Sequence, residues 1–175
     1  MSASKSAPGP LEPRRLWARD ELARTLAGMR TRTPGLKVVL ANGCFDLLHV
    51  GHLRYLRGAR ALGDRLVVAL NSDASVRALK GPGRPWVTLA ERAELLLGLE
   101  SVDAAVVFEE ADLSATLRLL RPAVHAKGSD YTLETVPEAA LDRELGITVA
   151  ITGDPKDHAS SALAARIARA QDFNG

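Results

Sequence analysis

Five short, mostly apolar segments alternate along this chain with segments of helical periodicity. The apolar segments lie at 37–41, 65–70, 102–108, 123–126 and 147–151. Their apolar residues run on without alternating with polar ones, which is typical of strands buried on both faces of a parallel sheet. The helical segments between them supply the crossovers that parallel strands need. The pattern therefore predicts a Rossmann-like, doubly wound α/β domain with a five-stranded parallel sheet.

The rest of the chain is organised around that sheet. Apolar spacing and turn residues predict helices at 16–29, 47–62, 89–99, 113–120 and 137–145, a short one that begins near 73, and a last one that reaches about 170. A length of 175 residues suits a single domain, which we assign to residues 14–175. Residues 1–13 are small, polar and rich in proline, so we expect a disordered tail there.

Composition narrows the class of protein. The net charge is +2, and no basic block suggests a nucleic-acid partner. No apolar segment is long enough to span a membrane, and residues 1–10 lack the apolar centre of a signal peptide. The single cysteine, Cys44, cannot form an internal disulfide, and no Cys/His spacing suggests a metal site. We therefore expect a cytoplasmic protein with no resident metal and neither a membrane nor a nucleic-acid partner.

The segment 37–52, KVVLANGCFDLLHVGH, carries the strongest chemical signal. A buried strand runs into an Asn-Gly turn and then into a helix, at whose opening His49 and His52 share one face. Gly51 between them leaves room for a close approach. The free N–H groups and the positive dipole end of a helix N-terminus favour an anion. The segment predicts a phosphate site that also contains two imidazoles.

The stretch GCFDLLHVGH resembles the signature of the nucleotidyltransferase superfamily, the cytidylyltransferase-like enzymes with a His-x-Gly-His motif. The resemblance implies transfer of a nucleotidyl group from a nucleoside triphosphate to a phosphorylated small molecule. A phosphate oxygen of the acceptor attacks the α-phosphorus in line and pyrophosphate leaves, without a protein nucleophile. Cys44 is then expected to be a small filler.

The resemblance also implies roles for individual residues. The catalytic candidates are His49, His52 and Lys80. The nucleotide-binding candidates are Asn42, Gly43, Cys44, Phe45, Gly51, Lys127, Gly128, Asp130, Ser160 and Ser161. The substrate-binding candidates are Asn71, Asp73 and Arg92.

For several residues a structural interpretation stays open. Lys80 fits a solvated loop lysine, Ser72 a helix cap, and Arg92 an organising role beside a phosphate-binding one. Asp46 is expected to hold the turn, and His125, inside an apolar strand, to be a core residue with a hydrogen-bond partner. For His158, in the last loop, contact with ligand and a solvated position are both open.

The C-terminal loop departs from the cytidylyltransferase pattern. Ser160 and Ser161 stand where relatives carry a Ser-Thr-Thr run, but the third position is Ala162. The arginine that many cytidylyltransferases place earlier in this loop falls on Pro155. These differences weaken an assignment to the cytidylyltransferases themselves.

Several segments together, among them LNSD, LKG and KGSDY, look most like the adenylyltransferase domain of bacterial ADP-heptose synthases, here in stand-alone form. That implies transfer of AMP from ATP, with Mg²⁺, to D-glycero-D-manno-heptose 1-phosphate, and a possible homodimer or larger homo-oligomer. One alternative is a cytidylyltransferase acting on glycerol 3-phosphate or a similar phosphorylated alcohol. Another is a nucleotide-binding module without turnover.

Overall fold

The computed structural model describes residues 11, 14–154, 163–166 and 169. Its strands are β1 (Leu16–Trp17), β2 (Val38–Gly43), β3 (Arg65–Asn71), β4 (Ala104–Phe108), β5 (Val124–Gly128) and β6 (Thr148–Thr152). Its helices are α1 (Arg19–Arg32), α2 (Val50–Arg60), α3 (Asp73–Lys80), α4 (Leu89–Leu97), α5 (Ser114–Leu120) and α6 (Ala139–Glu144). Residues 163–166, within the predicted last helix, are helical as well.

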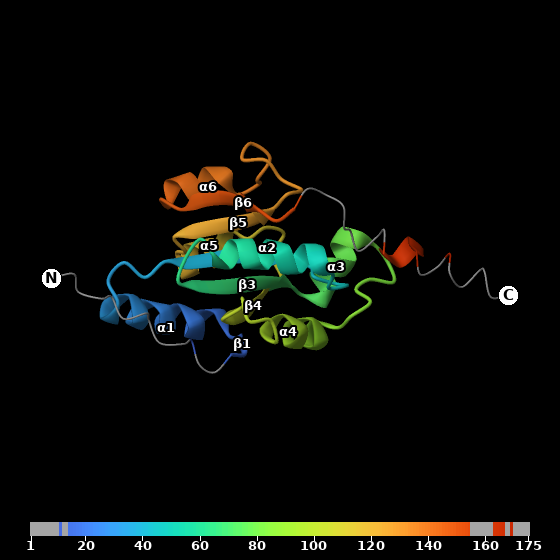
Figure 1. Ribbon diagram of the computed structural model, residues 1–175, viewed down its shortest axis with the longest axis horizontal. Coiled ribbons are helices and arrows are strands. Elements are labelled where there is room, and N and C mark those ends of the chain that lie inside the picture. Colours follow the sequence, from blue (N-terminus) through green and yellow to red (C-terminus); the bar gives the residue numbers. More distant parts are fainter. Residues whose placement is uncertain (1–10, 12–13, 155–162, 167–168, 170–175) are drawn as a thin grey trace.

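The strands form one parallel sheet in the order β1-β4-β3-β2-β5-β6 (Figure 1). From β2 the chain first builds outward through β3 to β4, then returns to place β5 on the other side of β2. The direction of winding therefore reverses between β2 and β5. In open α/β sheets, ligands bind outside the carboxyl ends of the strands at such a reversal.

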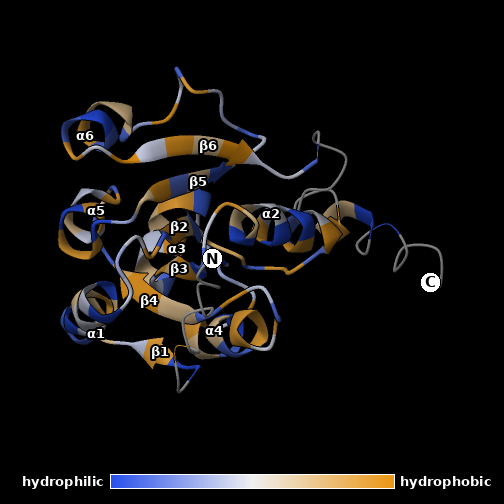
Figure 2. Ribbon diagram, turned by 60° about the vertical axis from the view of Figure 1, so that its left-hand side comes forward, coloured by the Kyte–Doolittle hydropathy of each residue, from blue (hydrophilic) through white to orange (hydrophobic). Residues whose placement is uncertain are grey.

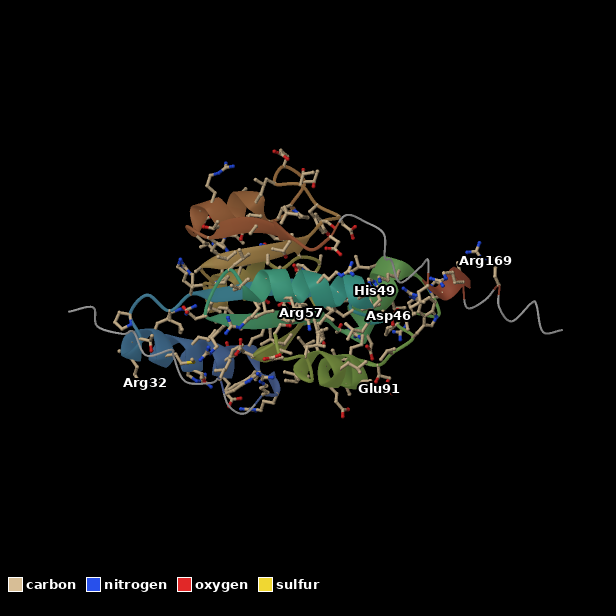
Figure 3. All side chains as sticks on the ribbon, in the orientation of Figure 1. Arg32, Asp46, His49, Arg57, Glu91 and Arg169 are labelled. Atoms are coloured by element: carbon tan, nitrogen blue, oxygen red, sulfur yellow. The ribbon has the colours of Figure 1, made fainter. Side chains whose placement is uncertain are left out.

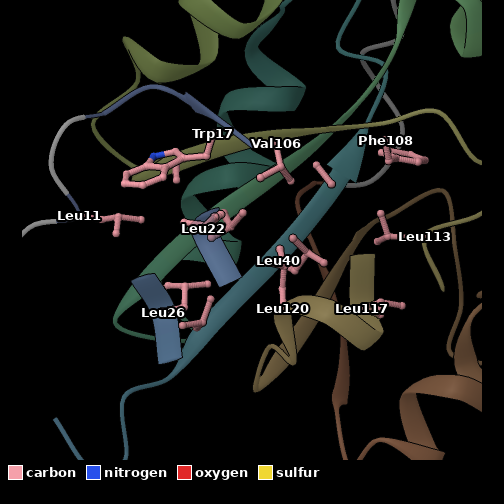
Figure 4. Packing of buried hydrophobic residues seen from close by; sticks show 14 of the residues in the cluster. Leu11, Trp17, Leu22, Leu26, Leu40, Val106, Phe108, Leu113, Leu117 and Leu120 are labelled. Carbon is pink, nitrogen blue, oxygen red and sulfur yellow. The ribbon is translucent and has the colours of Figure 1, made fainter. Parts of the chain in front are cut away.

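Helices cover both faces of the sheet, with α1, α5 and α6 on one side and α2 and α4 on the other (Figure 2). Side chains of each central strand alternate between two cores: Val38 and Leu40 of β2 pack towards α1 and α5, whereas Val39 and Ala41 pack towards α2 and α4. Figure 4 shows the first of these cores, where Leu22 of α1 is fully buried. Burial on both faces explains why the strands read as continuous apolar runs.

The prediction of a parallel, Rossmann-like sheet is confirmed, but the strand count of five is wrong. The strand that the sequence did not predict is β1, a two-residue edge strand in which Leu16 pairs with Ala105 and Trp17 with Val106. The sequence assigned Leu16 to the first helix, which instead begins at Arg19. Two residues have no periodicity of their own, so only pairing with β4 makes them a strand.

The open interpretation of Ser72 as a helix cap is confirmed, and Thr88 caps a second helix. The hydroxyl of Ser72 accepts from the N–H of Ser75 at the start of α3, and Thr88 forms a capping box with Glu91 at the start of α4. Within the predicted tail, Leu11 is buried in the first core, while residues 1–10 and 12–13 lie outside the described part of the chain. None of the described helices has both the length and the apolar character needed to cross a bilayer.

Candidate active site

A cleft of about 1130 Å³ opens at the carboxyl ends of the strands, where β2 and β5 lie side by side. Its walls come from the ends of β2, β3, β5 and β6, the first turn of α2 and the loop before α4. The candidate residues that line it are Asn42, Gly43, Cys44, Phe45, His49, Gly51, His52, Asn71, Lys80, Lys127, Gly128 and Asp130. The fold therefore brings together residues from four separate segments of the sequence.

Two predicted residues, Asp73 and Arg92, do not line this cleft. Ser160, Ser161 and His158 lie outside the described residues, so their predicted roles stay predictions. Among the described residues, no group of three or more His, Cys, Asp and Glu side chains is arranged to hold a metal ion.

The two histidines occupy the first turn of α2 (Figure 3 labels His49 at this end of the helix). His49 is the N-cap residue, with extended backbone, and His52 is the third residue of the helix. Their rings stack with centroids 3.8 Å apart. The Nδ1 atom of His52 accepts a hydrogen bond from the backbone N–H of His49 (3.4 Å). The proton of a neutral His52 ring therefore lies on Nε2.

The charge state of His52 follows from its surroundings. Burial, the neighbouring His49 and the positive charge of Lys80 lower its pKa from 6.5 to about 4, while Asp130 and a hydrogen bond with the Leu47 backbone act in the opposite direction. At neutral pH the ring is thus a neutral hydrogen-bond donor. A polyanion bound nearby would favour protonation of His52, because its negative charge offsets the neighbouring positive charge that lowers the pKa.

Phe45 shapes the turn between β2 and α2. It has a positive φ of 49°, uncommon for a bulky residue, and its ring is nearly buried. The ring lies 5.0 Å from that of His52, measured between centroids. A Cβ on Gly43 would come within 3.1 Å of the Phe45 ring. Gly43 therefore leaves room for the aromatic ring that supports His52.

Arg92 of α4 is buried and joins the segments that form one wall of the cleft. Its Nη1 donates to the carbonyl of Cys44 (2.6 Å) and its Nη2 to the carbonyl of Asn71 (3.0 Å) and to Asp73 (2.7 Å). Its Nε donates to the carbonyl of Val87 (3.1 Å). These contacts fit the organising role that was left open for Arg92, because the guanidinium is engaged by the protein.

Asp46 has a structural role, as expected, but its side chain holds a distant loop at residues 84–87. Its Oδ1 accepts from the N–H groups of Trp86 (2.7 Å) and Val87 (3.1 Å), and its Oδ2 lies 2.9 Å from Nε of Arg84. The guanidinium carbon of Arg84 lies 3.5 Å from the centre of the Trp86 ring. The end of the loop that follows Lys80 is thereby fixed beside the cleft.

On the opposite wall, Lys127 is buried and paired. Its Nζ lies 3.1 Å from Glu138 Oε2 and donates to Asn42 Oδ1 (3.1 Å). Gly128 follows, and a Cβ there would meet nothing within 4 Å. Asp154, after β6, accepts from Ser129 through its carbonyl and pairs with Arg54 through its carboxylate.

Several cleft residues were not among the site candidates predicted from the sequence, namely Tyr55, Arg84, Trp86, Asp112, Glu138, Thr152 and Asp154. Glu138 is an example, because its place beside Lys127 depends on how α6 packs on β5. The cysteine fits the filler prediction: Cys44 Sγ donates to Asn71 Oδ1 (3.6 Å), and burial raises the pKa of the thiol.

Replacing Arg92 with lysine tests its organising role. A single ammonium cannot reproduce the guanidinium's contacts, so buried carbonyls lose their donors, and the free energy of unfolding should fall by roughly 2–4 kcal/mol. Urea denaturation measures this loss. The matched control, Arg77→Lys on the exposed side of α3, should change stability by less than about 0.5 kcal/mol. Equal losses in both variants would contradict the role.

The low pKa of His52 predicts a pH dependence of stability. Between about pH 4 and 6.5 the unfolded chain binds a proton that the folded protein does not. The free energy of unfolding should therefore fall as pH drops from 6.5 to about 4, by at most about 3 kcal/mol, and level off below. Denaturation across this range should show a smaller fall for His52→Gln, whose side chain can still accept from the His49 N–H. Parallel curves would contradict the pKa shift.

Known proteins with similar sequences match two thirds to three quarters of this chain. The bifunctional protein HldE of Syntrophotalea carbinolica is 52% identical over 118 residues, which are 67% of this chain and 24% of that protein. The bifunctional protein HldE of Pseudomonas entomophila is 45% identical over 130 residues, which are 74% of this chain and 28% of that protein. This chain thus spans about a quarter of the length of the curated relatives it matches.

A solved structure supports the relationship. The lipopolysaccharide core biosynthesis protein from Thermoplasma volcanium GSS1 is 35% identical and superposes with a TM-score of 0.57, covering 67% of this chain and 94% of that protein. Residues 40–162 match the sequence model of the family described as cytidylyltransferase-like, and this range includes the histidine pair, Arg92 and Lys127. The chain belongs to the cytidylyltransferase-like family of nucleotidyltransferases.

Proposed function

We propose that this protein transfers AMP from ATP to a sugar 1-phosphate, D-glycero-D-manno-heptose 1-phosphate, and forms ADP-heptose and pyrophosphate. The observation that carries the proposal is the stacked pair His49 and His52 on the first turn of α2, facing a cleft at the reversal of the sheet. A helix N-terminus with two imidazoles suits a triphosphate. A volume of about 1130 Å³ is ample for a nucleotide and a sugar phosphate together.

The transfer needs positioning and charge stabilisation rather than a protein nucleophile. A phosphate oxygen of the acceptor forms a bond to the α-phosphorus of ATP, while the bond from that phosphorus to the bridging oxygen breaks and pyrophosphate leaves with the electron pair. Neutral His52 donates from Nε2 to a phosphoryl oxygen, and its protonation becomes favourable as negative charge gathers there. Lys80, exposed at the end of α3 and lining the cleft, adds positive charge.

We further propose that Mg²⁺ enters with ATP. Its preferred ligands are oxygens at octahedral positions, most of which phosphates and water supply when it accompanies a nucleotide. Asp130 lines the cleft close enough to influence His52, and its carboxylate is the donor type that suits this ion. When bound, the ion neutralises charge on the phosphates.

The choice of acceptor rests on the names of relatives and on the walls of the cleft. The structural neighbour is described as a lipopolysaccharide core biosynthesis protein, and heptoses are constituents expected of such a core. Carboxylates of Asp112, Asp130 and Glu138 line the cleft and offer acceptors for sugar hydroxyls. The choice of ATP rests on the resemblance to ADP-heptose synthases and on the departures at Pro155 and Ala162.

Pyrophosphate release tests this function. The protein is assayed with Mg²⁺ and each of ATP, CTP, GTP and UTP, crossed with heptose 1-phosphates and glycerol 3-phosphate. We expect release with ATP and D-glycero-D-manno-heptose 1-phosphate. Release only with CTP and glycerol 3-phosphate would favour the cytidylyltransferase alternative, and binding without release from any pair would favour a non-catalytic module. As a control, His52→Ala should lower turnover at least about 100-fold, equivalent to about 3 kcal/mol.

A substitution at Gly128 tests nucleotide binding without a large expected effect on the stability of the fold. Because an added Cβ meets nothing within 4 Å, Gly128→Ala should leave the free energy of unfolding within about 0.5 kcal/mol of the unaltered protein. The methyl group would stand at the cleft wall, so ATP affinity should fall at least about tenfold, measured by titration calorimetry. Gly98→Ala, at the end of α4 and away from the cleft, should leave affinity unchanged. Equal affinities for both variants would remove Gly128 from the nucleotide site.

A further inference from the structure

At the back of the cleft lies a group of four buried ionisable side chains, of which His125 and Asp142 have no part in the proposed transfer. His125 of β5 and Asp142 of α6 are fully buried, and Lys127 and Glu138 are almost so. Asn42, at the end of β2, connects all four to the cleft, because its side-chain oxygen contacts both His125 and Lys127. The sequence predicted His125 as a core residue with a hydrogen-bond partner, which the structure confirms, but it did not indicate this connection.

The contact with Lys127 fixes which way the amide of Asn42 points. Lys127 Nζ lies 3.1 Å from the Asn42 atom assigned as Oδ1. An ammonium group can only donate hydrogen bonds, so the atom facing it must be the carbonyl oxygen. Since the amide is planar, its NH₂ group points away from Lys127, and Asn42 lines the cleft. This orientation leaves the NH₂ group as the part of the amide that can donate to a ligand in the cleft.

The contact with His125 supports the same orientation. Nε2 of His125 lies 3.4 Å from Asn42 Oδ1, a long hydrogen bond, and Nδ1 lies 2.9 Å from Asp142 Oδ2. Because Oδ1 only accepts, Nε2 must carry a proton for this bond to form. A second proton lies between Nδ1 and the carboxylate.

The balance of buried charge agrees with a ring that donates from both nitrogens. Lys127 and Glu138 form one ion pair, with Nζ and Oε2 3.1 Å apart. Asp142 faces His125, and its other oxygen, Oδ1, is buried with no hydrogen-bond partner among the described residues. With one proton on Nε2 and a second between Nδ1 and Asp142, the His125–Asp142 pair has no net charge, as has the Lys127–Glu138 pair, and an uncompensated buried charge would be strongly unfavourable.

We propose that His125 and Asp142 are positioning residues, which hold the Asn42 amide so that its NH₂ group donates to a phosphoryl oxygen bound in the cleft. With the amide reversed, its carbonyl oxygen would face the phosphate and repel it. A carboxylate that hydrogen-bonds one ring nitrogen of a histidine sets the tautomer of that ring. Here the histidine and its carboxylate in turn set the orientation of the Asn42 amide. The inference rests on the proposed function only for the identity of the ligand.

A double-mutant cycle tests this role. Asp142→Asn keeps the shape but replaces the carboxylate with an uncharged amide, which no longer holds a second proton on the His125 ring, so the contact between Nε2 and Asn42 is weakened. We expect kcat/KM for pyrophosphate release to fall roughly 30-fold in Asn42→Ala, roughly 10-fold in Asp142→Asn, and no further than roughly 30-fold in the double variant. Independent effects would multiply to roughly 300-fold and would overturn the proposal.

A control variant and a second measurement distinguish this positioning role from an effect on the stability of the fold. Leu26→Ala, at a buried position of α1, should destabilise the fold, and its effect on kcat/KM should multiply with that of Asn42→Ala. Nitrogen-15 NMR of the unaltered protein should show a proton on Nε2 of His125, and a ring without it would overturn the proposal even if Asp142→Asn fails to fold. The same double-mutant cycle can be measured through ATP affinity, which makes the test independent of turnover. Absence of release with every substrate pair would then contradict the proposed function alone.

Discussion

Parallel strands that end in the interior leave backbone carbonyls without partners, and the structure depends on one guanidinium to satisfy them. After β2 and β3 end, the carbonyls of Cys44 and Asn71 both accept from Arg92. A buried carbonyl without a donor costs free energy comparable to a lost hydrogen bond. Separating these segments would therefore be unfavourable. One side chain of α4 thereby fixes two of the segments that line the cleft.

The opposite side of the cleft is fixed by charge rather than by a single side chain. Lys127 and His125 approach Asn42 from β5, and each is paired with a carboxylate from the neighbourhood of α6. Buried pairs of this kind contribute little net stability, but they admit few arrangements, because breaking one leaves an uncompensated charge. The cleft therefore lies between two rigid walls, while the mouth carries exposed groups such as Lys80.

The histidine pair lines the cleft at the first turn of α2. His52 sits against Phe45, whose unusual backbone conformation is set by the turn, and its pKa is lowered by burial and by neighbouring positive charge. A neutral imidazole beside a helix N-terminus binds a polyanion without first carrying a charge of its own. Under the proposed function, a bound triphosphate would favour protonation of the His52 ring, because the negative charge of the ligand stabilises the positive form.

The sequence alone determined the parallel α/β domain and most of the cleft, because continuous apolar strands and the His-x-Gly-His turn are local patterns. It placed His49 and His52 correctly on one helix turn, since residues three apart share a face. Only the tertiary structure decided that Leu16 belongs to an edge strand, that Arg92 binds backbone carbonyls, and that His125 reaches Asn42. Those contacts join residues distant in sequence, and they exist because the sheet brings the carboxyl ends of its strands together at one edge.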